Sequence, residues 1–164
     1  AAEGIAAMNI GRIDHETTSN VGIIRGGTAT NIVCDSVYVE GEARSFCEKK
    51  LEDLVKSMVD AMEARVAKRG ASVQTKVQKS YTGFSLKETS PVVQWATSAV
   101  RRSGLLPVLI STGGGSDANI FNEKGLPAVN LGTGAQNVHT TKEYISERDL
   151  YTIGDIIVAI MTGA

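Results

Sequence analysis

The pattern of the chain changes near residues 83–88, and this change constrains the fold more than any single motif. Before it, segments of alternating apolar and polar residues flank one long helical pattern. After it, short apolar segments alternate with helical patterns. Alternating helices and strands are typical of a parallel sheet, whereas strands grouped around one helix are typical of an α+β block. The sequence therefore predicts an α/β chain in two parts, residues 1–83 and 84–164.

The first part is expected to be an antiparallel sheet with helices on one face. Residues 21–25 and 35–44 are strand-like, and a third strand is predicted over residues 72–82. Ser45 and Glu48 have the spacing of a capping box that starts a helix. Six apolar residues then keep helical spacing: Leu51, Leu54, Val55, Met58, Met62 and Val66. Gly70 is suited to the end of that helix.

The second part alternates helices with two short apolar strands, residues 107–110 and 127–131. Ser90 followed by Pro91 starts one helix, which ends at Gly104, and a short helix is expected around residues 118–123. A last helix begins at Ser146 and presents Leu150, Ile153, Ile157 and Ile160 to a core. Two apolar parallel strands need further strands beside them. We infer that sheet partners are missing from this chain.

Composition excludes several classes of partner. The chain has 17 basic and 18 acidic side chains without long runs of either sign, so neither nucleic acid nor an anionic membrane is an expected partner. No apolar stretch is long enough for a membrane span. Cys34 and Cys47 lack metal-type spacing, so two reduced thiols in a cytoplasmic protein are expected. The start at Ala1, without Met, suggests a piece of something longer.

Two loops of the second part carry candidate site residues. The amides of the glycine-rich residues 113–117 could hold an oxyanion or a carboxylate. Alternatively, Ser116 or Asp117 could serve only as the N-cap of the helix that follows. His139 follows the second predicted strand. It is a candidate metal ligand or acid/base group, or a histidine that only satisfies hydrogen bonds of its loop. The residues alone leave both alternatives open.

A nucleophilic role for Ser116 is the third alternative, because a Gly-x-Ser turn between strand and helix resembles the elbow of α/β-hydrolases. Ala118 stands where the second glycine of that elbow belongs, and Glu123 would have to serve as the acid. Asn31 and Arg44, taken by themselves, are ordinary for a turn asparagine and a surface cation.

Two groups of motifs together resemble one family. The first is Gly-Arg-Ile-Asp-His-Glu-Thr-Thr, Gly-Gly-Thr-Ala-Thr-Asn-Ile-Val and Glu-Gly-Glu-Ala-Arg-Ser. The second is Gly-Gly-Gly-Ser-Asp-Ala-Asn-Ile-Phe, Val-Asn-Leu-Gly and His-Thr-Thr-Lys-Glu-Tyr-Ile. They resemble the two-zinc peptidases and deacylases that include peptidase T, carboxypeptidase G and succinyl-diaminopimelate desuccinylase. The likeness is greatest to the peptidase T-like branch.

The resemblance implies a metallo-aminopeptidase for small peptides, with residues 1–83 as lid or dimerisation domain and 84–164 as the C-terminal portion of the catalytic domain. His139 matches the last zinc ligand. Asn31 matches an asparagine that reaches the partner's site across a homodimer. Arg44 matches an arginine that binds the substrate carboxylate.

The second group of motifs contains further residues that match substrate-binding positions of the family. Other functional residues of the family have no match in this chain. Gly114 and Gly115 match backbone that contacts substrate, with Ser116 and Asp117 as support. The other zinc ligands and the glutamate that activates the bridging water have no match, so we expect no catalytic residue in this chain. The rival to an enzyme part is an inactive dimerisation module.

Overall fold

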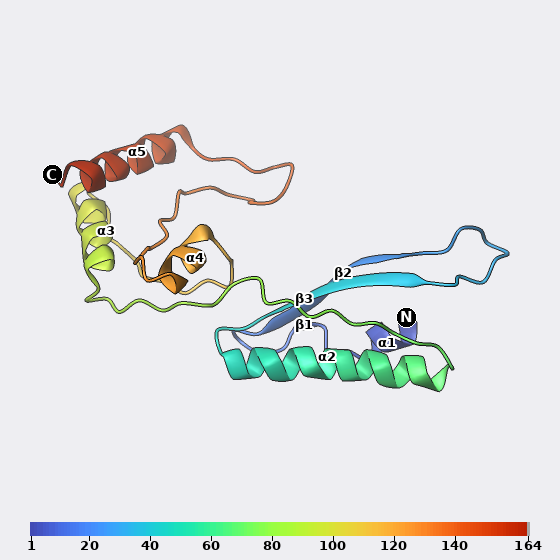
Figure 1. The fold of residues 1–164 in the computed structure, drawn as a ribbon. Coiled ribbons are helices and arrows are strands. Elements are labelled where there is room, and N and C mark those ends of the chain that lie inside the picture. Colours follow the sequence, from blue (N-terminus) through green and yellow to red (C-terminus); the bar gives the residue numbers. More distant parts are fainter. Residues whose placement is uncertain (164) are drawn as a thin grey trace. The chain divides into compact units, whose positions relative to one another are not determined.

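The computed structural model describes residues 1–163, which form two compact units. The first unit is Ala1–Lys79, and the second begins at Ser80. The first unit contains an antiparallel sheet in the order β1-β2-β3. Figure 1 shows α1 and α2 on one side of this sheet. The elements are α1 (Ala2–Ala6), β1 (Gly11–Arg12), β2 (Thr18–Gly26), β3 (Val37–Arg44) and α2 (Glu48–Lys68).

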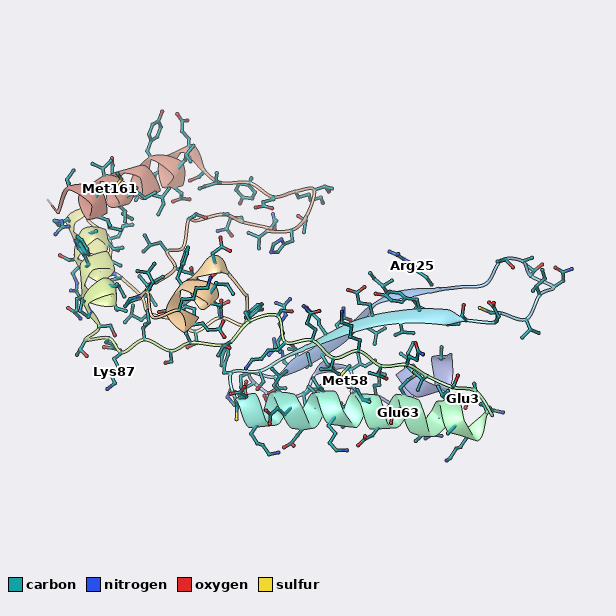
Figure 2. The ribbon with its side chains drawn as sticks, in the orientation of Figure 1. Glu3, Arg25, Met58, Glu63, Lys87 and Met161 are labelled. Carbon is teal, nitrogen blue, oxygen red and sulfur yellow. The ribbon has the colours of Figure 1, made fainter. Side chains whose placement is uncertain are left out.

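Helix α2 covers the sheet with the apolar stripe that its sequence predicts. Leu54, Met58 and Met62 are buried, and α2 packs against both α1 and β3. Figure 2 shows Met58 on the side of α2 that faces the strands. Gly4 of α1 allows a close approach, because a Cβ atom there would overlap the Met62 sulfur. The predicted antiparallel sheet with helices on one face is confirmed.

The predicted start of α2 is wrong by two residues. Cys47, not Ser45, is the N-cap. The Ser45 hydroxyl donates to Glu16 Oε2 at 2.8 Å, and it accepts from Cys47 N at 3.1 Å. The Ser45 hydroxyl, which a capping box would have used, therefore bonds to Glu16 from a distant part of the sequence. Glu48, the other residue of the predicted box, pairs with Lys79.

The strand predicted over residues 72–82 is also wrong, since this stretch forms no strand in the structure. Lys79 Nζ lies 2.5 Å from Glu48 Oε1, at the opposite end of α2 from Gly70. A 21-residue helix is about 32 Å long, and ten extended residues span at most about 36 Å. The chain after Gly70 therefore runs back along α2 nearly extended, without the neighbouring ladder that defines a strand.

A cluster of charges fastens the loop before β2 to the start of α2. Lys50 Nζ lies 2.8 Å from both Asp14 Oδ2 and Glu16 Oε1. Glu16 is only 7% exposed at its side chain and also accepts from Phe46 N at 2.6 Å. The hydrogen bond from Lys50 is the largest cause that lowers the pKa of Glu16 to about 2. The same lysine lowers the pKa of Asp14.

The second unit contains three helices and, among the described residues, no strand. These helices are α3 (Pro91–Arg102), α4 (Asp117–Glu123) and α5 (Glu147–Thr162). Helix α3 packs against α5, with Val93, Ala96, Ala99 and Ile156 buried. Of the residues predicted to face the core from α5, Leu150 and Ile157 are exposed instead. The reason is that α5 packs against α3 through the face that carries Ile156.

The two strands predicted in the second unit, over residues 107–110 and 127–131, are absent from the described structure. Val108 is 78% exposed and Ile110 is 81% exposed. An apolar segment becomes a strand only when its backbone pairs with a neighbour. The described residues supply no such neighbour to either segment.

None of the helices in the described chain combines the length and the apolar character needed to cross a membrane.

Candidate functional site

The β2–β3 hairpin holds Asn31 and Arg44 at opposite ends. Asn31 is exposed in the loop of residues 27–36, beyond the pair Gly26 and Val37, which closes the ladder. Arg44 lies opposite Thr18 at the other end of the ladder. Eight residues of β3 separate the two ends, a length of roughly 26 Å. Asn31 and Arg44 of one chain therefore cannot contact the same small molecule.

Arg44 already has an anionic neighbour. Its Nη2 lies 2.9 Å from Glu42 Oε1, and its side chain is 43% exposed. An exposed ion pair of this kind contributes little to stability. The guanidinium of an arginine carries N–H groups in a fixed fork that matches the two oxygens of a carboxylate.

The glycine-rich residues 113–117 lead directly into α4. Ser116 is the N-cap of this helix, as one of the alternatives predicted, and its N–H donates to Asn119 Oδ1 at 3.0 Å. Asn119 is buried, at 6% exposure. Gly114 and Gly115 are exposed. The turn thus exposes two glycines, while the residue after them is fixed by a buried amide.

The Ser116 hydroxyl is occupied by an amide. Asn130 Nδ2 lies 3.0 Å from Ser116 Oγ, and Asn130 Oδ1 lies 3.2 Å from it. A serine nucleophile needs a basic group at this position. Within the described residues, the hydroxyl has an asparagine there and no histidine, so the nucleophile hypothesis finds no support in the geometry.

His139 stands in a tightly closed loop. Backbone hydrogen bonds between Gln136 and Tyr144, at 2.8 and 3.1 Å, form its base. Inside it, Thr140 Oγ1 donates to Asn137 O at 2.8 Å, and Glu143 Oε2 accepts from His139 N at 3.1 Å. Asn137 and His139 have φ of 52° and 65°.

A positive φ is uncommon for residues other than glycine and persists where neighbouring contacts hold it, often at functional sites. The imidazole of His139 is presented at the surface of this held loop, because the residue is exposed. A neutral imidazole at such a position is a suitable metal ligand.

The described residues do not complete a metal centre. No group of three or more His, Cys, Asp or Glu side chains gathers among residues 1–163. Catalytic zinc usually has three protein ligands. The donor chemistry of His139 fits a metal, but the ligand set of the described residues does not.

The structure also identifies residues that the sequence patterns did not single out. Asn122 Nδ2 donates to Ala128 O at 2.7 Å, and Asn122 Oδ1 accepts from Ala128 N at 3.2 Å. This side chain thus satisfies both backbone groups of one residue, as a neighbouring strand would. The spacing of Ser116 and Asn119 resembles a capping box, and it could have indicated Asn119. Nothing local in the sequence links Asn122 to Ala128.

Comparison with known proteins assigns the family. The pattern that defines Peptidase family M20/M25/M40 matches residues 3–162. The chain belongs to this family. The match covers both units, so the M20 pattern includes the hairpin, the glycine-rich residues and the His139 loop together.

Two solved structures are similar to this chain over nearly its whole length. An aminopeptidase PepT from Bacillus cereus is 42% identical, with a TM-score of 0.79, and the likeness covers 97% of this chain and 43% of that one. A tripeptidase from Staphylococcus aureus is 38% identical, with a TM-score of 0.87 and the same coverage of both chains. Among curated relatives, the uncharacterized protein YqjE of Bacillus subtilis is 39% identical over the whole chain. Peptidase T of Alkaliphilus oremlandii is 28% identical over 72% of the chain.

The chain spans less than half the length of these relatives. It covers 44% of YqjE and 30% of the Alkaliphilus peptidase T.

Proposed function

We propose that this chain is part of a peptidase T-like, metal-dependent aminopeptidase that hydrolyses small peptides, tripeptides among them. The observation that carries the proposal is the likeness of 97% of the chain to an aminopeptidase and to a tripeptidase, at 42% and 38% identity. Residues 1–83 would be the lid or dimerisation domain, and residues 84–164 the C-terminal portion of the catalytic domain. The enzyme would work in the cytoplasm.

The metal in this proposal is zinc, and His139 would be one of its ligands. The support is the closed loop that keeps His139 at a φ of 65° with its side chain at the surface. When bound, zinc supplies a Lewis acid for the peptide carbonyl. Within the second unit, Gly114 and Gly115 would contact the peptide backbone, while Ser116 and Asp117 would support their turn.

The substrate carboxylate would bind to Arg44, and Asn31 would act in the site of a second chain. The length of the hairpin supports this division, since one chain cannot bring both residues to one peptide. Self-association through the first unit has physical support as well. Strand β3 lies at the edge of the sheet, and Ile24, Val33 and Tyr38 of the hairpin are 59%, 93% and 55% exposed.

The test is a peptidase assay of the full-length protein with a tripeptide, before and after treatment with a chelator. Activity should disappear with the metal and return with added zinc. His139→Ala should lower kcat/KM by more than about 100-fold, since even residues that only support a metal ligand are worth roughly 10- to 100-fold. Bound zinc, measured by mass spectrometry, should fall with it.

The matched control is His15→Ala. His15 is the only other histidine of the sequence, and its side chain is 84% exposed in the loop before β2. This variant should keep full activity and zinc content. Unchanged turnover of His139→Ala at saturating zinc would refute the assignment. Activity that resists the chelator would favour a serine hydrolase, and no activity at all would favour the inactive dimerisation module.

A further inference from the structure

The first residues of the second unit lie against the glycine-rich turn. A Cβ atom on Gly115 would overlap the ring and hydroxyl of Tyr81. Gly115 is not among the glycines with positive φ, so its backbone is open to any residue type. The contact with Tyr81, and not the backbone conformation, is therefore what a side chain at residue 115 would disturb.

A buried amide fastens the same segment to the same turn. Asn119 Nδ2 donates to Thr82 O at 2.9 Å, while Asn119 Oδ1 accepts from Ser116 N at 3.0 Å. Asn119 is 6% exposed, and both ends of its amide are used. A second bond runs from Thr82 Oγ1 to Glu123 Oε1 at 2.9 Å. Tyr81 is thus held over Gly115 by the anchoring of the residue that follows it.

Consecutive glycines have more conformational freedom than any other pair of residues, and they have no side chains with which to limit it. A turn that binds substrate through its backbone must nevertheless be fixed beforehand, because ordering it on binding would cost affinity. Here the fixed elements beside the turn are the Tyr81 ring on one side and the N-cap of α4 on the other.

We propose that Tyr81 is a positioning residue, which packs on Gly115 and holds the backbone of Gly114 and Gly115 in the geometry that receives the peptide. This role rests on the proposed function, in which the turn contacts substrate. Two of the three Tyr81 atoms nearest to Gly115, Cζ and Cε1, belong to the ring, so phenylalanine should keep most of the contact.

The first test is kinetic and uses the full-length enzyme. Tyr81→Ala should lower kcat/KM for a tripeptide by about 10- to 100-fold, the range expected when a binding group is misplaced by about an ångström. The loss should appear mainly as a higher KM, because the turn binds the peptide and does not react with it. Bound zinc should not change. Tyr81→Phe should stay within about twofold of wild type, by the same reasoning.

Tyr151→Ala is the matched control for the loss of a tyrosine. Tyr151 lies on α5 and is 68% exposed, so its removal should change neither kcat nor KM. Wild-type kcat/KM in Tyr81→Ala would overturn the proposal, as would an equal loss in Tyr81→Phe and Tyr81→Ala.

The second test does not depend on activity. Gly115→Ala should destabilise the wild-type protein, and the loss should shrink in a Tyr81→Ala background, where the ring no longer occupies the space. Strictly additive losses would show that the two residues do not interact, and they would overturn the proposal.

Backbone order parameters of Gly114 and Gly115 decide the matter if Gly115→Ala does not fold. They should drop from about 0.85 in wild type toward about 0.6 in Tyr81→Ala, and unchanged values would overturn the proposal. If the wild-type protein hydrolyses no peptide, the proposed function fails. The stability cycle and the order parameters then still confirm or refute the role of Tyr81 in holding the turn.

Discussion

At the scale of single residues, the first unit depends on carboxylates whose partners come from distant parts of the sequence. Glu16 contacts Ser45, Phe46 and Lys50, all about thirty residues away along the chain. These bonds join the loop before β2 to the start of α2. The His139 loop shows the opposite arrangement, since the partners of His139 and Asn137 lie within five residues.

The acid dependence of stability should follow Glu16 together with Asp14, since Lys50 lowers the pKa of both carboxyl groups. The pKa of Glu16 is lowered from 4.5 to about 2 in the folded state, so the folded protein binds a proton less readily than the unfolded chain. The stabilisation is therefore complete above about pH 4.5 and is lost as the pH falls toward about 2. Unfolding by urea, measured at several pH values in this window, should show this loss.

Lys50→Met tests whether the ion pair with Lys50 causes this pH dependence of stability. It removes the largest contribution to the lowered pKa of Glu16, so stability should depend less on pH between about 4.5 and 2. Lys56→Met on the same helix is the control, because Lys56 pairs with exposed Asp60 one helical turn away. Equal pH profiles for Lys50→Met and the wild type would contradict the assignment.

Glu143 should help to fix the backbone conformation of His139, and with it the position of the imidazole. Its carboxylate accepts the His139 N–H at 3.1 Å, and this bond helps to keep the positive φ. Glu143→Ala should weaken zinc binding by the full-length enzyme about tenfold, at the low end of what supporting residues are worth. Glu143→Gln should retain affinity, because its amide oxygen accepts the same bond. Competition with a chromogenic chelator measures both, and equal affinities for Ala and wild type would contradict the role.

At the scale of elements, three helices end in the same way. Gly70, Gly104 and Gly125 have φ of 67°, 77° and 79° and follow α2, α3 and α4. In each case the next residue donates its N–H back to a carbonyl five residues earlier, as in Ala71 to Val66 at 3.3 Å. These endings were predictable at Gly70 and Gly104, since glycine after an apolar helical stripe is a local signal.

The apolar stripe of α2 predicts that substitutions on its buried face cost more unfolding free energy than substitutions on its exposed face. Met58 is buried at 9% exposure, so Met58→Ala should cost about 2–5 kcal/mol of unfolding free energy. Glu63→Ala changes an exposed residue of the same helix (Figure 2) and should stay within about 0.5 kcal/mol. Urea unfolding followed by circular dichroism measures both, and similar losses would mean that α2 does not pack on the sheet through Met58.

At the scale of the whole molecule, the hairpin geometry bears on how many chains make one site. Asn31 lies in the loop beyond one end of a ladder that is roughly 26 Å long, and Arg44 lies at its other end. In the proposed homodimer, Asn31 of each chain would serve the site that contains His139 of its partner. Two defective chains could then make one complete site between them.

Mixed dimers of full-length Asn31→Ala and His139→Ala should therefore recover activity. One of their two sites combines intact metal ligands from the first chain with an intact Asn31 from the second, so up to about half of the activity per site should return. Each variant alone should dimerise normally and hydrolyse peptides poorly. A monomer by light scattering, or no recovery despite proven exchange of subunits, would exclude the role of Asn31 across the dimer.

The candidate site was only partly predictable. Ser116 as N-cap of α4 follows from its position before a helical pattern, and Asn31, Arg44 and His139 were assigned through motifs shared with a family. The contacts of Tyr81 with Gly115 and of Asn122 with Ala128 were not predictable. A single ring contact, or a hydrogen bond from a helix side chain to the loop after it, leaves no periodic pattern in the sequence.

The sequence by itself determined the helices of this protein, because helical hydrogen bonds, N-caps and C-terminal glycines all lie within a few residues of one another. It also determined the β2–β3 hairpin, whose two strands are neighbours along the chain. Tertiary structure alone decided that residues 72–82, 107–110 and 127–131 are not strands, and that Ser45 binds Glu16 and does not cap α2. The physical reason is that a strand forms only beside a partner with which its backbone can pair, and a side-chain oxygen bonds to the group that the fold brings near it. In these cases the partner is distant in sequence.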